Sequence, residues 1–168
     1  MPNYPVLECS IMTETIPLLN NIADYYTQKI SAHGASPAGV DWNGAESQAL
    51  RFDQLSRVIS QPSGATINDV GCGYGAYFDY LRTRWPDIAY AGYDISPAMI
   101  EEAMRRHPDE HRCRFSVGSQ AAEPADYSIA SGIFNVRLEV SDEDWWAHII
   151  AMLDQMHETS QRGFAANS

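Results

Sequence analysis

The chain has 168 residues, 45% of them hydrophobic and 20% charged, which is a composition typical of a globular protein with a single core. Acidic residues outnumber basic ones by 22 to 11, and this excess disfavours DNA, RNA and anionic membranes as general partners. No apolar run approaches the roughly 20 residues that span a bilayer, and no secretory signal is visible, so we expect a cytoplasmic protein.

Two helices are expected before residue 62, where apolar residues recur at helical intervals. The predicted elements are a helix over 13–34, a loop over 35–43 and a helix over 44–61. The second helix is expected to bury Leu50, Leu55, Val58 and Ile59 on one side and to end before Pro62. We interpret residues 1–62 as a helical cap or lid region.

Beyond residue 62 the pattern changes to short apolar strands that alternate with helices. The predicted strands are 65–70, 88–94, 113–118, 125–134 and 163–167, and the predicted helices are 76–85, 96–107 and 141–160. This alternation predicts an α/β fold over 63–168, with a doubly wound, mainly parallel, Rossmann-like sheet. Such sheets bind ligands beyond the carboxyl ends of their strands, near the point where the strand order reverses.

The histidines and cysteines give little sign of a metal site. His107 and His111 stand four residues apart, but Pro108 follows the first of them, and a bare histidine pair is a weak pattern. We expect a solvated helix end there and no metal. The three cysteines, at positions 9, 72 and 113, are odd in number and widely spaced, as is usual in a reducing compartment.

The stretch INDVGCGYGA puts Gly71, Gly73 and Gly75 between a predicted strand and a predicted helix. Without Cβ atoms the chain can turn tightly there, and a ligand can lie against the backbone. Asp94 ends the next strand, 23 residues after Gly71, where a carboxylate can accept hydrogen bonds from both hydroxyls of a ribose. The pattern therefore predicts a nucleoside ligand, although Asp94 could instead cap the following helix.

Two classes of nucleoside ligand compete for this turn. The letters GCGYGA also fit G-x-G-x-x-A, which would suit NAD. Asp69, two residues before Gly71, favours a different ligand, since a carboxylate there would repel a pyrophosphate and attract a sulfonium or ammonium group. Its carboxylate could instead accept hydrogen bonds from the amides of the turn itself.

With D-x-G-x-G-x-G at 69–75 and YDISPAMI at 93–100, the chain resembles the class I S-adenosylmethionine-dependent methyltransferase family. The resemblance implies S-adenosylmethionine as cofactor, with S-adenosylhomocysteine as product. It assigns cofactor contacts to Asp69, Gly71, Cys72, Gly73, Gly75, Asp94, Ile95, Met99, Ser119, Gln120 and Ser131. Ser119 and Gln120 stand where the family often has an acid, and SGIFN at 131–135 is not the N-P-P-Y of amide and adenine N-methyltransferases. Ile95 and Met99 could equally be core residues.

Methyl transfer from a sulfonium mainly requires alignment and exclusion of water, so no catalytic triad is expected. The candidates on the substrate side are Trp42 and Asn43, in a lid with Asp41, and Asn135, which could also be a turn residue. Trp42 could stack on a substrate or anchor its loop. Arg51 could pair with the carboxylate of the cofactor or with Glu46 or Asp53.

Three hypotheses follow: a methyltransferase acting on a small molecule, a noncatalytic module that binds S-adenosylmethionine, and an NAD-dependent oxidoreductase, which Asp69 disfavours. Family members continue beyond strand five, whereas this sequence ends at GFAANS. We expect a sheet cut short after strand five, the alternative being an edge strand covered by a second copy in a homodimer. The methyl acceptor stays open.

Overall fold

The computed structural model describes residues 8–108, 111–137 and 140–168. One parallel sheet has the strand order β3-β2-β1-β4-β5, from β1 (Thr66–Val70), β2 (Ala89–Asp94), β3 (Cys113–Val117), β4 (Ala125–Ser131) and β5 (Ser160–Asn167). The predicted α/β class is confirmed. The chain moves outward from β1 to β3 and then returns to β4 on the other side of β1, so the strand order reverses between β1 and β4.

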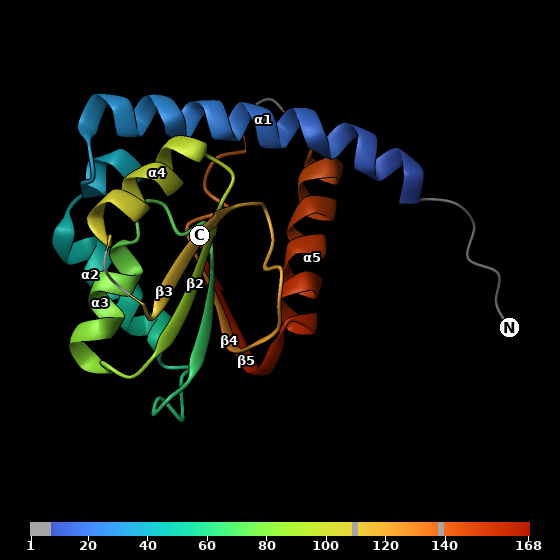
Figure 1. The fold of residues 1–168 in the computed structure, drawn as a ribbon. Helices are drawn as coiled ribbons and strands as arrows, with labels where there is room; N and C mark the ends of the chain where they lie inside the picture. Colours follow the sequence, from blue (N-terminus) through green and yellow to red (C-terminus); the bar gives the residue numbers. More distant parts are fainter. Residues whose placement is uncertain (1–7, 109–110, 138–139) are drawn as a thin grey trace, which may run out of the picture.

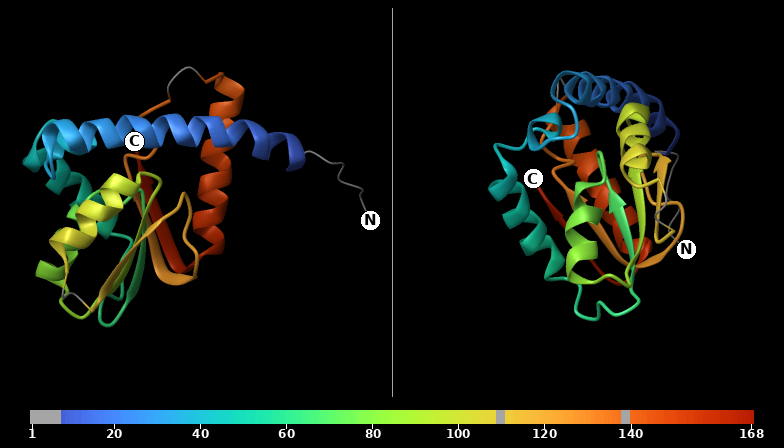
Figure 2. Two further views of the ribbon diagram at one scale, coloured as in Figure 1. Left: turned by 45° about the horizontal axis from the view of Figure 1, so that its top comes forward. Right: turned by 60° about the vertical axis from the view of Figure 1, so that its left-hand side comes forward.

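Helices cover both faces of this sheet and one of its ends (Figure 1). They are α1 (Glu8–His33), the short 3₁₀ helix η1 (Pro37–Val40), α2 (Ala45–Ser56), α3 (Ala76–Arg84), α4 (Pro97–Arg106) and α5 (Asp142–Glu158). Helices α2, α3 and α4 lie on one side of the sheet and α5 on the other. Helix α1 crosses over the carboxyl ends of the strands in both views of Figure 2. The division at residue 62 into a lid region and a cofactor domain stays a prediction.

Local capping explains where the helices beside this end of the sheet begin. The Ser96 hydroxyl accepts a hydrogen bond from the Met99 N–H (3.4 Å), and Pro97 occupies the first turn of α4, where a missing N–H costs nothing. Ser141 caps α5 in the same way through the Asp144 N–H (3.1 Å). Of the two adjacent tryptophans on α5, Trp145 is buried and Trp146 is 62% exposed.

The prediction for the second helix is wrong in two respects. Leu50 is 62% exposed, because α2 buries the face that carries Phe52 and Leu55. The helix also ends at Ser56 rather than continuing toward Pro62. The chain then turns, with the Ile59 N–H donating to the Ser56 carbonyl (3.0 Å), so that Ile59 reaches the core from outside the helix.

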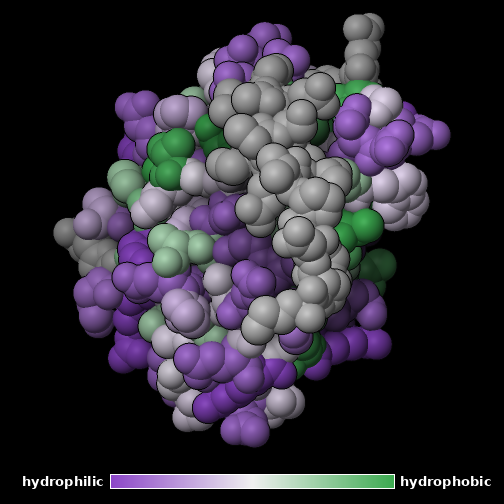
Figure 3. Space-filling view, turned by 90° about the vertical axis from the view of Figure 1, so that its right-hand side faces the viewer, coloured by the Kyte–Doolittle hydropathy of each residue, from purple (hydrophilic) through white to green (hydrophobic). Residues whose placement is uncertain are grey.

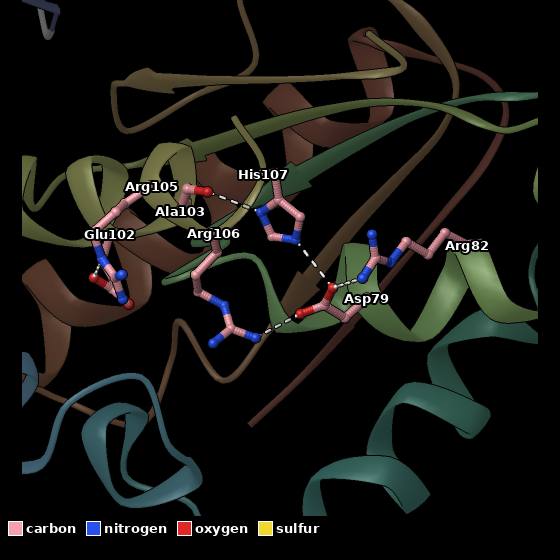
Figure 4. A network of polar contacts seen from close by, with 7 residues as sticks. All are labelled: Asp79, Arg82, Glu102, Ala103, Arg105, Arg106 and His107. Carbon is pink, nitrogen blue, oxygen red and sulfur yellow. Dashed lines mark hydrogen bonds and ion pairs between the residues drawn. The ribbon is translucent and has the colours of Figure 1, made fainter. Parts of the chain in front are cut away.

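The expectation of a solvated helix end at His107 is also wrong, since the His107 side chain is only 1% exposed (Figure 4). Its Nε2 lies 3.0 Å from Asp79 Oδ1, and its Nδ1 lies 2.8 Å from the Ala103 carbonyl oxygen. Arg82, on the same helix, and Arg106, at the end of α4, also form ion pairs with Asp79. The contacts of Arg106 and His107 with Asp79 therefore join the end of α4 to α3. The Asp79 carboxylate from α3 and the Ala103 carbonyl from α4 together compensate for burying this imidazole.

Among the described residues, no helix is long and apolar enough to cross a membrane. Seen from the side of α5, the visible described surface carries hydrophobic residues in small separate groups among hydrophilic ones (Figure 3).

Candidate functional site

A cavity opens beneath α1, at the carboxyl ends of β1, β2 and β4, with about 940 Å³ of empty space that is continuous with solvent. Its wall comes from α1, η1, α2, the glycine turn after β1, the starts of α3 and α4, the ends of β2 and β4, the segment after β3, and α5. This is the position that the reversal of strand order predicts for a ligand in an open parallel sheet.

The glycine turn borders the cavity, and its three glycines occupy positions that do not suit a side chain. Gly71, Gly73 and Gly75 all have positive φ angles, of 77°, 54° and 86°. A Cβ on Gly71 would lie 2.2 Å from Ile133 Cγ2, and one on Gly73 would lie 3.1 Å from Val40 Cγ1. Gly71 and Gly73 line the cavity, whereas Gly75 caps α3 and packs on the buried His107.

Asp94 lies at the end of β2, next to the glycine turn in the cavity wall. Its two carboxylate oxygens accept hydrogen bonds of 2.9 Å from the Gly73 N–H and the Ser96 N–H. Each oxygen keeps a lone pair for a ligand. Burial raises the pKa of Asp94 to about 6, against the opposing effect of the two N–H groups. The same carboxylate thus joins the turn to the start of α4 and lines the cavity.

Asp69 is the second carboxylate in the wall, and it lacks part of its hydrogen bonding. Its Oδ2 accepts a hydrogen bond from the Tyr90 hydroxyl, but its buried Oδ1 has no partner among the described residues. Burial raises the pKa of Asp69 to about 7. An unpartnered buried carboxylate oxygen beside a cavity is suited to a ligand that brings a hydrogen-bond donor or a positive charge.

Other predicted cofactor residues also reach the wall. These are Cys72, Ile95, Met99, Ser119 and Ser131. The Ser131 hydroxyl is buried without a hydrogen-bond partner among the described residues, so it too could serve a ligand. Gln120 is not among the lining residues, because its side chain is exposed beyond the end of β3.

Trp42 lines the cavity and is 9% exposed. Its ring lies so close to Gly132 that a Cβ there would be 2.7 Å from Trp42 Cζ2. The guanidinium of Arg51 lies 4.4 Å from the centre of the Trp42 ring and donates a hydrogen bond to the Ser168 carbonyl oxygen (2.6 Å). Arg51 therefore supports Trp42 rather than lining the cavity, and Asp53 pairs instead with Arg57 and Arg84.

The segment that carries Trp42 is fastened to α1. The Tyr25 hydroxyl donates a hydrogen bond to Asp41 Oδ2 (2.6 Å), and Lys29 Nζ lies 2.6 Å from Asp41 Oδ1. Asn43, the other lid candidate, is exposed and lies outside the cavity wall. Asn135 is exposed too, with its N–H bonded to the Gly132 carbonyl (3.3 Å), as in a turn.

Sequence reasoning missed most of the residues that α1 and α5 contribute to the wall. The missed ones are Leu19 and Ile22 from α1, and His148 and Met152 from α5. Tyr26 of α1 also lines the cavity. His148 is half-buried, its ring stacks on Trp145 at 5.5 Å between centroids, and burial lowers its pKa. The spacing of Trp145, His148 and Met152 at three and four residues signals one helix face, but it does not say that this face borders a cavity.

Comparisons with known proteins agree with this geometry. A family model described as a methyltransferase domain matches residues 67–160, which contain the glycine turn, Asp94 and all of α5. A Mycobacterium tuberculosis protein whose name assigns it as a methyltransferase without a substrate is 44% identical over 111 residues, covering 66% of this chain and 67% of that protein.

Trans-aconitate 2-methyltransferases are more distant relatives. The protein of Klebsiella pneumoniae is 32% identical over 124 residues, covering 67% of this chain and 47% of that protein. The protein of Methylobacterium nodulans is 37% identical over 94 residues, covering 50% of this chain and 35% of that protein. The match thus spans half or less of the length of these two relatives.

Solved structures show the same fold at low identity. A mycolic acid cyclopropane synthase in complex with SAH and CTAB has a TM-score of 0.59 at 20% identity, covering 72% of this chain and 42% of that one. A magnesium protoporphyrin IX methyltransferase from Synechocystis with bound SAM has a TM-score of 0.53 at 18% identity, covering 68% of this chain and 55% of that one.

Proposed function

The chain belongs to the class I S-adenosylmethionine-dependent methyltransferase family, and on this premise we propose that its cavity binds S-adenosylmethionine and transfers the methyl group to a small molecule. In this proposal Asp94 binds the ribose hydroxyls, Ile95 and Met99 pack on the adenine, and Ser119 and Ser131 contribute polar contacts. Gly71, Cys72 and Gly73 hold the methionine part, with Asp69 beneath it.

The observation that carries the proposal is the unpartnered oxygen of Asp69 beside the glycine turn. Two buried carboxylates, Asp69 and Asp94, line the cavity, and among the described residues no lysine or arginine does. A diphosphate would therefore meet two acidic side chains and no described lysine or arginine at this turn, whereas an ammonium or sulfonium group would find a partner. This charge pattern favours the methyl donor over NAD.

When bound, S-adenosylmethionine supplies a methyl group that is already activated by the sulfonium. The residues of this chain then have to orient the two reactants and exclude water. Helix α1 and the segment that carries Trp42 cover the cavity and serve the second task. A hydroxyl or amine acceptor must also lose a proton, and the half-buried imidazole of His148 in the wall is a suitable acceptor for it.

Isothermal calorimetry with S-adenosylhomocysteine and with NAD tests cofactor binding. We expect the adenosyl compound to bind and NAD to give no heat at the same concentrations. Tight binding of NAD with none of S-adenosylhomocysteine would overturn the proposal in favour of an oxidoreductase.

Turnover separates an enzyme from a module that only binds the cofactor. Release of S-adenosylhomocysteine on incubation with metabolite pools is expected for the wild-type chain. A His148→Phe variant should bind S-adenosylhomocysteine as well as the wild type does. In the turnover assay it should form S-adenosylhomocysteine more slowly. Cofactor binding without any methyl transfer would instead support the noncatalytic alternative.

Finer points belong to the same proposal. We propose a small molecule rather than a nucleic acid as acceptor, since the net charge of −11 repels phosphate backbones. A cytoplasmic location is supported by the odd number and wide spacing of the cysteines. Pairing with a second copy remains one way to cover an edge of the sheet.

A further inference from the structure

One part of the cavity that has no assigned cofactor contact lies between α1 and α5. Leu19, Ile22 and Tyr26 are spaced three and four residues apart, so they present one face of α1 to the cavity. Met152 and His148 stand one turn apart on α5 and line the same space. This part of the wall is therefore apolar and aromatic, with one imidazole.

The charges near this space are already paired or point elsewhere. Lys29, on α1, forms an ion pair with Asp41 at 2.6 Å and does not line the cavity. Arg51 is held by the Trp42 ring and the Ser168 carbonyl, also outside the wall. Among the described residues, the charged groups that do line the cavity are the carboxylates of Asp69 and Asp94.

These observations restrict what can occupy the space. A ligand with several carboxylates would be desolvated next to two acidic side chains and would find no described cation in the wall. An uncharged apolar ligand would instead exchange water for contacts with Ile22, Tyr26 and Met152. The half-buried His148 could accept a hydrogen bond or a proton from one hydroxyl or amine of that ligand.

We propose that the methyl acceptor is an uncharged, largely apolar molecule and not a di- or tricarboxylate. This inference rests on the proposed function, because it takes the glycine side of the cavity as the cofactor site. It separates this chain from the tricarboxylate named in the trans-aconitate relatives.

A matched pair of ligands tests the charge directly. Trans-aconitate and its trimethyl ester share a carbon skeleton, but at neutral pH only the first is an anion. Each is added in increasing concentration to the chain saturated with S-adenosylhomocysteine and with N-phenyl-1-naphthylamine. This uncharged dye fluoresces more strongly in apolar surroundings, so its displacement lowers the fluorescence. We expect the dye to bind and the triester to displace it at a concentration at least about 100-fold lower than trans-aconitate.

A cation placed in the wall provides the second arm. In the Leu19→Lys variant, trans-aconitate should displace the dye at a concentration at least about 10-fold lower than in the wild type. The control, Ile150→Lys, adds the same charge on the exposed side of α5 and should leave both displacement curves unchanged. Comparable circular dichroism spectra of the three proteins establish that they are folded.

Three outcomes would overturn the inference: a wild-type cavity that does not bind the dye, displacement by trans-aconitate at or below the concentration of the triester, and an equal gain in both lysine variants. Loss of the proposed function gives a different result, since S-adenosylhomocysteine would then fail to bind in calorimetry. The dye competition can still be measured on the free chain in that case.

Discussion

One wall of the cavity, at residues 69–75 and 94–99, is built around the glycine turn and two buried carboxylates and is called the backbone wall. The opposite wall, called the side-chain wall, consists of side chains that α1 and α5 bring together. The first wall is continuous with β1 and β2, and its hydrogen bonds run from the glycine turn to Tyr93 and Asp94. The second depends on helices separated by more than 100 residues in the chain. A shared cofactor can therefore be held by a local motif, while the acceptor side can vary between relatives.

The largest expected effect comes from breaking the backbone wall at Gly71. Gly71→Ala adds a Cβ at 2.2 Å from Ile133 Cγ2 at a φ of 77°, and strain plus overpacking should together cost about 4 kcal/mol of unfolding free energy. Urea denaturation measures this loss. Gly64→Ala is the control, since its φ is also positive (64°) but nothing lies within 4 Å. Equal losses in the two variants would mean that only backbone strain matters.

The next effect is the pH dependence that Asp69 creates. Its pKa is raised from 3.8 unfolded to about 7 folded, so the folded chain binds more protons between these values and loses stability as the pH rises. We expect the wild type to lose about 3 kcal/mol of unfolding free energy through Asp69 between pH 4 and pH 7.

Asp69→Asn checks this prediction, because it removes the titrating group and should flatten that part of the stability profile. The remaining slope should include the contribution of Asp94, whose pKa is also raised, to about 6. Identical profiles for the wild type and the Asn variant from pH 4 to pH 7 would contradict a raised pKa at Asp69.

A smaller effect is expected at the ribose contact. Asp94→Ala should weaken S-adenosylhomocysteine binding by about 1–3 kcal/mol, since the ribose hydroxyls would lose their acceptor. Calorimetry measures the change, and Glu101→Ala, an exposed acid on α4, controls for the loss of one negative charge. Unchanged affinity in Asp94→Ala would remove this residue from the cofactor site.

The smallest effect tests how the side-chain wall is supported. Arg51→Ala removes the guanidinium from the Trp42 ring and should cost about 1 kcal/mol of unfolding free energy. Arg57→Ala removes a charge from a well-exposed side chain at the end of the same helix and should cost less. If the two variants lose the same stability, the stacking on Trp42 does not support the wall.

Much of the backbone wall could be predicted from the sequence because its signals are local. The glycines at 71, 73 and 75, the strand before them and the acid at 94 lie within one strand–helix–strand unit, and the family match covers the same segment. The burial of His107 could not be predicted in this way. Its partner Asp79 stands 28 residues earlier, on a helix whose contact with α4 follows only from the sheet order.

The sequence by itself determined the α/β class, the order of helices and strands, and the glycine-rich turn after the first strand, since each depends on residues close together in the chain. Only the tertiary structure decided that Arg51 supports Trp42, that Gln120 points away, and that α1 and α5 enclose an apolar space beside two carboxylates. The physical reason is that helical periodicity shows which face of a helix is buried, whereas packing between distant segments decides whether that face meets protein or a cavity.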